Sequence, residues 1–457
     1  MPLKKTNPLN NVVFFLCSPS LGILDNWLPV MWNLKERQKD LKFIIVFPRA
    51  NFIDQINLSN VLLILGEKIF DSIVFKSKAG LWLAADTFYQ LKTINKLTIF
   101  EWFLLRVIRK LKKWPITATV SKFILYWYNK FSKRLNKRHL YDWQFTEKRA
   151  ACIFYDVYEE SKLYNVGLMK NFREVPKFSI QHGINISNSG ILKNTKKVLN
   201  GGYRKDVKAY LFSSEERHFY EHKYAIHKSF MEVVGVPRHS PDWMEFIQLN
   251  IPKQNNEINS LKNGSIFIIS RPGNTIYHPY KRKKKALENI KQLAWNDLKK
   301  NIVIKLHPKE KKEGIYEEVF GIDNYGDKWV YSELHPFVLG KESDFAISFY
   351  SGVVIDMLAL GVPTIEYLDL RGIPEYDNDE SLRDKMDHPV FSYRYLDLVL
   401  GASDYKQMKA HAMEIMNDRE TVLSRLQATY NELFPQIENI NDKIAQDILD
   451  VSAKKYV

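Results

Sequence analysis

The sequence predicts an α/β protein with two doubly wound parallel-sheet domains. Short apolar runs of strand character alternate with polar, helix-capable segments along most of the chain, which is typical of parallel sheets with right-handed crossovers. The length of 457 residues is too great for one ordinary core. A hydrophobic content of 45% with 26% charged residues excludes a disordered chain.

The first series of predicted strands occupies residues 1–240. It opens with the apolar run "NVVFFLC", a turn rich in Ser, Pro and Gly, and a helix from about Asp25. Further strand-like runs are "LKFIIVFPR", "NVLLILG", "DSIVFKS", "ACIFYD", "KFSIQHG", "KAYLFSS" and "SFMEVVGV". We expect one N-terminal domain here, interrupted by a basic helical insertion at about residues 96–148.

The second series follows the polar stretch "IPKQNNEINSLKNG". Its strand-like runs are "GSIFIIS", "NIVIKLH", "WVYSEL", "DFAISFY" and "GVPTIEY", and it is expected to form a C-terminal domain over residues 241–403. Residues 404–457 have a helical pattern and are expected to pack on or between the domains. Tandem domains of this kind direct the carboxyl ends of their strands toward a shared cleft, where such sheets bind ligands.

The sequence gives no sign of disulfides, export or membrane spans. Cys17 and Cys152 both stand in apolar runs, which favours small buried side chains and a reducing compartment over a disulfide or zinc site. The N-terminus lacks a signal core with a cleavage site, and no apolar run is long enough to cross a bilayer. We therefore expect a cytoplasmic protein.

The net charge of +15 indicates an anionic partner, and part of this charge is concentrated in one segment. From Trp102 to Tyr141 there is no Asp or Glu, while Lys and Arg interleave with Phe, Trp, Leu and Tyr. Basic amphipathic helices of this composition lie on anionic membrane surfaces. The alternatives are a solvated face on packed structure and nucleic acid, but no nucleic-acid recognition motif is present. We expect an inner-membrane surface as the partner.

Three motifs stand at predicted strand ends, namely "IQHG", "IKLHPKE" and "SFYSGVVIDMLALGVPTIEY". In this order, on two α/β domains, they resemble the GT-B glycosyltransferases of bacterial capsule, lipopolysaccharide and O-antigen synthesis. The group in question contains Kdo transferases, polysialyltransferases and CDP-glycerol glycerophosphotransferases. The resemblance implies a nucleotide-sugar donor, a glycan or glycolipid acceptor, and neither cofactor nor metal. No Asp-x-Asp dyad stands at a strand end, and "DND" at residues 377–379 lies in a polar loop.

The C-terminal domain is expected to hold the donor nucleotide. Ser351 is a suitable helix N-cap, and Gly352 lets backbone amides approach a phosphate. His307 is fixed by the ring of Pro308 and can donate to a phosphate or ribose. The resemblance adds Glu366 as a ribose ligand. The complete predicted donor site is Arg271, Lys305, His307, Pro308, Ser348, Ser351, Gly352 and Glu366, while His335 is a second, weaker His-Pro candidate.

The N-terminal domain is expected to deprotonate the acceptor hydroxyl. His182 follows a strand, between Gln181, which can orient a neighbour, and Gly183, which permits a sharp turn; its pKa suits a general base. Asp25 and Asp156 are rival bases because both follow a strand at the same edge, although either residue is equally suited to cap a helix.

Three function classes fit these observations. The first is a glycosyltransferase with a CMP-linked donor such as Kdo or a sialic-acid-like sugar, with a CDP-polyol phosphotransferase as its nearest variant. The second is a nucleotide-sugar epimerase, which needs the cleft but no acceptor. The third is a non-enzymatic membrane or polyanion adaptor, for which the basic segment alone would suffice.

Overall fold

A computed structural model describes most of the two predicted domains. The described residues are 11–16, 22–47, 62, 65–66, 68–75, 119–120, 123–124, 127, 150–155, 175–183, 207–224, 226–251, 264–273, 277–307, 310, 314–373 and 382–454. Asp156, Pro308, Cys17 and most of the basic insertion therefore lie outside the described residues.

Among the described residues, the N-terminal sheet has seven strands, all parallel, in the order β3-β2-β1-β4-β5-β6-β7. The strands are β1 (Val12–Leu16), β2 (Lys42–Phe47), β3 (Ser72–Phe75), β4 (Ala150–Tyr155), β5 (Lys177–Ile180), β6 (Val207–Leu211) and β7 (Met231–Val233). The direction of the strand order reverses between β1 and β4. Ligands bind at such reversals in doubly wound sheets.

In the described part of the C-terminal domain, the sheet has six parallel strands in the order β10-β9-β8-β11-β12-β15. The strands are β8 (Ser265–Ile269), β9 (Asn301–Lys305), β10 (Trp329–Tyr331), β11 (Phe345–Ser348), β12 (Thr364–Tyr367) and β15 (Leu400–Ala402). Here the order reverses between β8 and β11. A separate antiparallel pair joins β13 (Leu382–Arg383) to β14 (Pro389–Val390).

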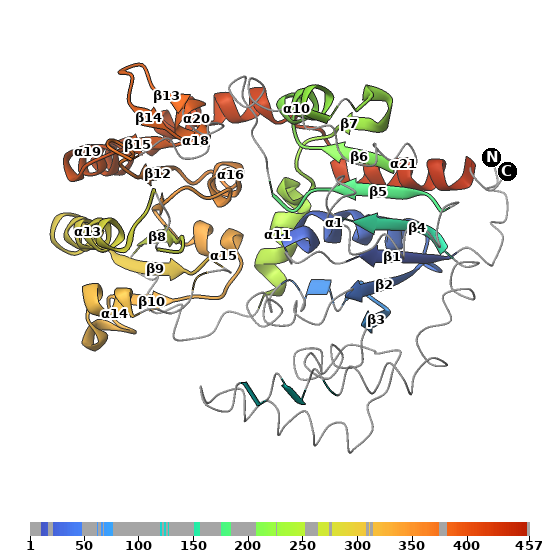
Figure 1. Cartoon of the computed structure of the whole chain (residues 1–457), viewed down its shortest axis with the longest axis horizontal. Helices are drawn as coiled ribbons and strands as arrows, with labels where there is room; N and C mark the ends of the chain where they lie inside the picture. The colour runs from blue at the N-terminus through green and yellow to red at the C-terminus, as the bar shows by residue number, and fades with distance from the viewer. Residues whose placement is uncertain are drawn as a thin grey trace.

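Helices connect these strands. The N-terminal part has α1 (Gly22–Arg37), α10 (Ser214–Tyr224), η3 (Lys228–Phe230), η4 (Pro237–His239) and α11 (Pro241–Asn250). The C-terminal part has α13 (Tyr280–Lys291), η5 (Gln292–Leu298), α14 (Ile315–Phe320), η6 (Ile322–Asn324), α15 (Pro336–Lys341), α16 (Val353–Ala359) and α18 (Ser392–Tyr395). In Figure 1 the two sheets lie side by side, with α11 and α15 between them.

The predicted helical tail forms α19 (Tyr405–Asn417), α20 (Arg419–Leu433) and α21 (Ile440–Lys454). Its last helix returns to the N-terminal domain, where α21 packs against α1 (Figure 1). Arg37 on α1 donates through Nε to Asp442 at 2.6 Å, and Tyr210 on β6 bonds to Asp447. The tail therefore ties the C-terminal domain to the N-terminal sheet.

The strands are buried because their sequences are continuous apolar runs covered on both faces, as expected for parallel sheets. Trp27 of α1 stacks on Phe154 of β4 in the hydrophobic core, with ring centroids 4.1 Å apart. Cys152 is also buried, as its surroundings predict, and burial raises the pKa of its thiol. The predicted strand "NVLLILG" is wrong, because its described residues Leu62, Leu65 and Gly66 are helical.

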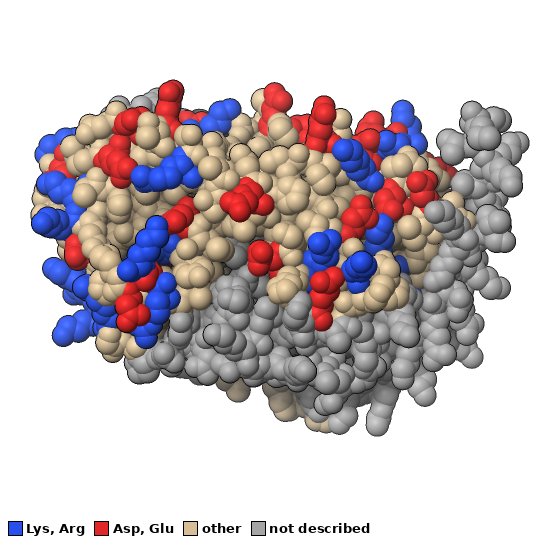
Figure 2. Space-filling view, turned by 90° about the horizontal axis from the view of Figure 1, so that it is seen from above, with Lys and Arg blue, Asp and Glu red and all other residues tan. Residues whose placement is uncertain are grey.

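The described residues contain no helix that is long and apolar enough to cross a membrane. On the face shown in Figure 2, the described Lys and Arg side chains are interspersed with Asp and Glu, with blue side chains gathered toward the left-hand end. Charge on this face is therefore mixed.

Candidate functional site

The carboxyl ends of the two sheets meet through a set of buried polar residues from both domains. We call this set the interface cluster; its members are Asp25, Asn26, Arg238, His239, His335, Asp356 and Tyr430. Asp25 and Asn26 lie near the start of α1, which follows β1, and Arg238 and His239 follow β7. His335 follows β10, and Asp356 lies in the first turn of α16 after β11. The facing strand ends predicted from the sequence are therefore present.

Asp25 and His335 join the domains directly. His335 Nε2 lies 3.1 Å from both carboxylate oxygens of Asp25, and His335 Nδ1 accepts a hydrogen bond from the Phe337 amide at 3.2 Å. Because Nδ1 is the acceptor, the proton of the neutral ring resides on Nε2 and is donated to Asp25. Asp25, a candidate base, and His335, a candidate phosphate ligand, therefore contact each other. The sequence did not predict this contact.

Arg238 and Asp356 make the second connection. Arg238 donates from Nε to Asp356 at 2.8 Å and from Nη1 to Asn26 at 3.0 Å, and its Nε lies 3.8 Å from Asp25. His239 Nε2 lies 2.7 Å from the same Asp356 oxygen. Burial alone would raise the pKa of Asp356, but Arg238 and His239 lower it to about 2, so this carboxylate is ionised at neutral pH.

The position of η4 depends on a glycine. Gly235 has a φ of +85°, and a Cβ at this residue would lie 2.4 Å from the Pro435 carbonyl oxygen. Only glycine adopts this backbone conformation without strain and leaves room for the tail. The turn aims Arg238 and His239 at α16, and the Tyr430 hydroxyl of α20 completes the contact with His239 Nδ1 at 2.8 Å.

The predicted "IQHG" turn lies beside the interface cluster. Gln181 is buried, and its carbonyl accepts a hydrogen bond from Asn26 Nδ2 at 2.6 Å, whereas His182 is exposed. Gly183 is half-buried and has open space around its Cα. Glu216 on α10 is buried nearby. Burial raises the pKa of its carboxyl to about 8, although hydrogen bonds from the Phe212 amide and from Gln181 act to lower it. The described part of the turn is therefore anchored at Gln181.

At the C-terminal reversal point, between β8 and β11, Arg271 meets the turn that follows β11. Arg271 Nε donates to the Tyr350 carbonyl at 2.5 Å, and its guanidinium lies 5.5 Å from the Tyr350 ring centroid. Tyr350 has a φ of +71°, a conformation that costs a non-glycine residue about 1–3 kcal/mol and is common at functional sites. Its ring stacks on Phe391 at 4.0 Å, which helps to hold the turn.

Two predicted serines lie in the same turn. Ser348 is fully buried at the end of β11, and among the described residues its hydroxyl has no hydrogen-bond partner. Ser351 accepts a long 3.4 Å bond from the Val353 amide, and Gly352 is the N-cap of α16. An unsatisfied buried hydroxyl costs free energy, so Ser348 is a natural place for a bound water or ligand oxygen.

Two other predicted donor residues, Lys305 and Glu366, have partners within the protein. Lys305 donates to the carbonyls of Glu333 and Leu334 at 3.1 and 2.8 Å, and so holds the loop before His335. Glu366 is 1% exposed, and its Oε1 lies 3.5 Å from Arg394 Nε. Its Oε2, like the Ser348 hydroxyl, has no hydrogen-bond partner among the described residues. Burial raises the pKa of Glu366, opposed by Arg394. Its ribose role stays a prediction.

His307 follows β9, next to the Arg271 loop. Its amide donates to Glu310 at 3.3 Å, and its carbonyl accepts from the Glu310 amide at 2.8 Å, which closes a tight turn at the end of the strand. Since β8 pairs with β9 on one side and with β11 on the other, His307, Arg271 and Ser351 follow three adjacent strands.

Sequence reasoning missed Arg238, His239 and Asp356. A signal was available, because Asp356 is the lone charge in the apolar stretch "VVIDMLAL", and a fully buried carboxylate needs a partner. The sequence did not reveal which cationic side chain is the partner of Asp356. No group of three or more His, Cys, Asp or Glu residues suited to a metal occurs within the described ranges.

A cavity of about 400 Å³ borders the Tyr350 turn, between α13, the end of β12 and the start of α19, and its lining residue Tyr277 packs edge-on against the Tyr350 ring at 6.4 Å. Tyr277, Arg282, Asn289, Tyr367 and Tyr405 are among its lining residues. None of the residues predicted from the sequence lines it, so we place the candidate site at the facing strand ends on the basis of topology and chemistry.

Two parallel sheets with facing carboxyl ends define the GT-B class of fold. The chain is similar to the wall teichoic acid polymerase TagF, in a variant soaked with CDPG, at 10% identity over 98% of this chain and 88% of that one, with a TM-score of 0.52. A UDP-N-acetylglucosamine 2-epimerase gives 10% identity, 98% and 96% coverage, and a TM-score of 0.52. No protein-family model and no curated protein matches the sequence. These similarities establish the fold.

Proposed function

We propose that this protein is a glycosyltransferase that binds a nucleotide-activated sugar at the reversal point between β8 and β11. One observation carries the proposal: Arg271, the Tyr350 turn and the buried Ser348 hydroxyl converge there, beside the interface cluster that joins the two sets of strand ends. Ligands of doubly wound sheets bind at this topological position.

The chemistry of transfer requires positive charge at the departing nucleotide phosphate. Arg271 is permanently charged and presents a planar fork that suits a phosphate. His307 follows the adjacent strand and adds a second donor, and Ser351 and the Ser348 hydroxyl add neutral ones. In this proposal these groups stabilise the leaving phosphate without a metal ion.

The N-terminal domain would supply the base for the acceptor hydroxyl. We assign this role to His182, because it is exposed beside an anchored Gln181, whereas Asp25 contacts His335 and Arg238. His182→Ala should lower the transfer rate on the order of 10²-fold or more with little change in nucleotide binding. Full activity in His182→Ala and its loss in Asp25→Asn or Asp156→Asn would transfer the role to a carboxylate.

For the donor we propose a cytidine nucleotide, with CMP-linked sugars first and CDP-polyols second. The motif resemblance supports CMP, and the similar TagF structure soaked with CDPG supports a CDP conjugate as the variant. Thermal-shift titration with CMP, CDP, UDP and GDP distinguishes the possible donor nucleotides, because a ligand that binds only the folded state raises the melting temperature. A clear preference for UDP or GDP would exclude a cytidine donor.

The site is tested by Arg271→Met in the same titration. We expect nucleotide stabilisation to fall by roughly tenfold or more in affinity, since a charge-assisted contact is lost. Arg425→Met is the matched control, because Arg425 is an arginine of α20 with a side chain that is 56% exposed. Equal nucleotide binding by Arg271→Met and Arg425→Met would move the nucleotide away from the β8–β11 reversal point.

The epimerase reading is favoured by the similar UDP-N-acetylglucosamine 2-epimerase fold. It predicts conversion of UDP-N-acetylglucosamine, or release of free sugar, without any acceptor. We expect neither with this protein, so product analysis after incubation with that nucleotide sugar alone decides between the two classes.

We also propose that the basic insertion places the enzyme on an anionic membrane surface. Val120, Phe123 and Trp127 are helical and 49%, 62% and 45% exposed, with the last two rings 6.0 Å apart. Exposed aromatic side chains within a cationic segment suit the headgroup region. Changing Lys112, Lys113, Lys133 and Arg134 to Glu should abolish binding to anionic vesicles, since each cation contributes roughly 1 kcal/mol.

Vesicle binding that survives this fourfold reversal would contradict the membrane placement. The nucleotide titration is its control, because the proposed nucleotide site lies in the other domain and should be unaffected. A protein that binds vesicles but none of the four nucleotides would instead be the non-enzymatic adaptor.

A further inference from the structure

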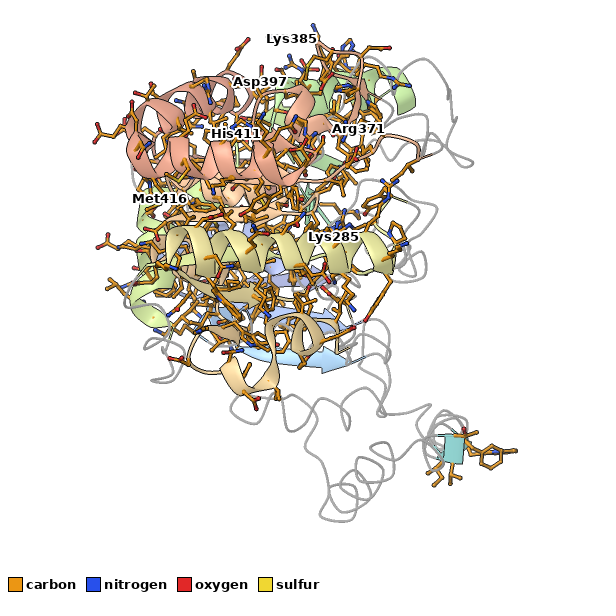
Figure 3. All side chains as sticks on the ribbon, turned by 90° about the vertical axis from the view of Figure 1, so that its left-hand side faces the viewer. Lys285, Arg371, Lys385, Asp397, His411 and Met416 are labelled. Atoms are coloured by element: carbon orange, nitrogen blue, oxygen red, sulfur yellow. The ribbon has the colours of Figure 1, made fainter. Side chains whose placement is uncertain are left out.

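Lys283 and Glu310 form an ion pair that is buried beneath the ends of β8 and β9. Their side chains are 1% and 2% exposed. Lys283 belongs to the basic run "KRKKK" of α13, where a solvated lysine is the ordinary expectation. Lys285, two residues further, is 70% exposed on the same helix (Figure 3). Lys283 is therefore turned inward for a specific contact.

Glu310 is the centre of convergent hydrogen bonds. Its carboxylate accepts from the Ser270 hydroxyl at 2.6 Å, from the Tyr316 hydroxyl at 3.0 Å and from the His307 amide at 3.3 Å, in addition to Lys283. A buried carboxylate is tolerated only when it is paired and hydrogen-bonded in this way. The arrangement fixes the start of the loop that carries His307.

Lys283 fixes the neighbouring loop. Its Nζ donates to the Arg271 carbonyl at 2.8 Å and lies 4.8 Å from the Tyr316 ring centroid. One ion pair thus holds the backbone at both Arg271 and His307, which follow adjacent strands. Such a pair adds little stability relative to apolar residues of the same size, so its effect on geometry is the property to test.

We propose that Lys283 and Glu310 are positioning residues that hold Arg271 and His307 in the geometry needed to bind a nucleotide phosphate. The proposal rests on the proposed function, because it takes the strand ends of β8 and β9 as the nucleotide site. Neither residue touches the nucleotide. Supporting residues of this kind commonly alter affinity by roughly 10- to 100-fold when removed.

The test replaces both charges at once, in Lys283→Met/Glu310→Leu, so that no buried ion is left unpaired. Lys285→Met/Glu288→Leu is the matched control, because it removes an exposed ion pair of 3.7 Å from the same helix. Hydrogen exchange is measured on peptides that contain Arg271 and His307, and binding is measured with CDP and with inorganic pyrophosphate. The melting temperature confirms that each variant is folded.

We expect faster exchange in both peptides and at least roughly tenfold weaker CDP and pyrophosphate binding in the buried-pair variant, with neither change in the control. Intermediate values are expected for Glu310→Gln, which keeps an acceptor for the His307 amide. Unchanged exchange in the folded double variant would overturn the proposal, and so would faster exchange with unchanged binding. If the parent protein binds neither CDP nor pyrophosphate, the proposed function fails, while the exchange data still decide whether the pair holds the two loops.

Discussion

The interface cluster and the Lys283–Glu310 pair are both buried and polar, but they join different parts of the molecule. The interface cluster links α1 and η4 of the N-terminal domain to α15, α16 and α20 of the other half of the chain. The Lys283–Glu310 pair links two loops of a single domain. The first can be broken by relative movement of the domains, whereas the second persists in any such movement.

The clusters also differ in chemistry. The interface cluster contains two histidines, and burial lowers the pKa of one of them, His239, whereas the Lys283–Glu310 pair contains no histidine. We therefore expect the contact between domains to depend on pH, and the arrangement of Arg271 and His307 to be constant.

Removing Arg238 should have the largest effect. Arg238→Met leaves the carboxylates of Asp356 and Asp25 buried without their cation, so the free energy of unfolding should fall by roughly 3–5 kcal/mol. Urea unfolding measures this loss. Arg425→Met, on the exposed surface of α20, should stay within about 0.5 kcal/mol of the parent. A loss below about 1 kcal/mol in Arg238→Met would mean that water already reaches the cluster, so that the domains separate easily.

Replacing Glu216, which borders the "IQHG" turn, should give the next largest change in the free energy of unfolding. Its folded pKa of about 8 lies above the ordinary value of 4.5, so between these pH values the folded protein binds the extra proton. Stability from this group is complete below about pH 4.5 and is lost as pH rises toward 8. Glu216→Gln should therefore be more stable than the parent at pH 8, on the order of 3 kcal/mol, and equal to it near pH 4.5. Parallel pH profiles would contradict this assignment.

His239 should give a smaller effect of opposite sign. Burial lowers its folded pKa below the ordinary 6.5, although Asp356 opposes this shift. The unfolded chain then binds the proton first, so stability falls as pH drops below about 6.5. The melting temperature of His239→Gln should decline less than that of the parent between pH 7.5 and 5.5. Lys283→Met/Glu310→Leu should keep the parent's pH profile in this range, and a change there would remove the contrast between the two clusters.

The ion pair between α1 and the C-terminal tail should make the smallest contribution to the free energy of unfolding. Arg37 contacts Asp442 on α21, but both side chains are about a third or more exposed. Arg37→Ala should cost about 0.2–1 kcal/mol, and the difference should shrink at 1 M salt because exposed charges are screened. A salt-independent loss above about 2 kcal/mol would indicate that the tail is held by this pair and not by packing of α21.

Most of the strands could be predicted from the sequence. Runs such as "FIIVF" and "IFII" are continuous apolar segments between helix-capable stretches, and this pattern alone predicts parallel sheets buried on both faces. Leu62 and Leu65 were assigned to a strand and are helical, because a short apolar run does not by itself distinguish a buried helix from a buried strand.

The candidate site was predictable only one strand end at a time. Arg271, His307 and Ser351 could each be placed at a carboxyl end, because local turn chemistry marks where a strand stops. Their adjacency depends on strand order, which is fixed by contacts between residues far apart in the chain. Lys305 was placed at a strand end in the same way, and it donates to the carbonyl of Leu334 in the loop before His335. Glu366 was added from the family resemblance, and its carboxylate lies beside Arg394. The donor-binding roles of both residues stay predictions.

The amino-acid sequence alone predicts the class of the fold, the two series of strands, the helical tail and the polar residues at the strand ends. These features follow from hydrophobic periodicity and turn chemistry, which act over a few residues. The packed fold, and not the local sequence, brings Asp25 to His335, Arg238 to Asp356 and Lys283 to Glu310. The physical reason is that a buried charge must find a partner wherever the packed chain brings one, and that partner is set by packing across more than a hundred residues in the first two cases and 27 in the third.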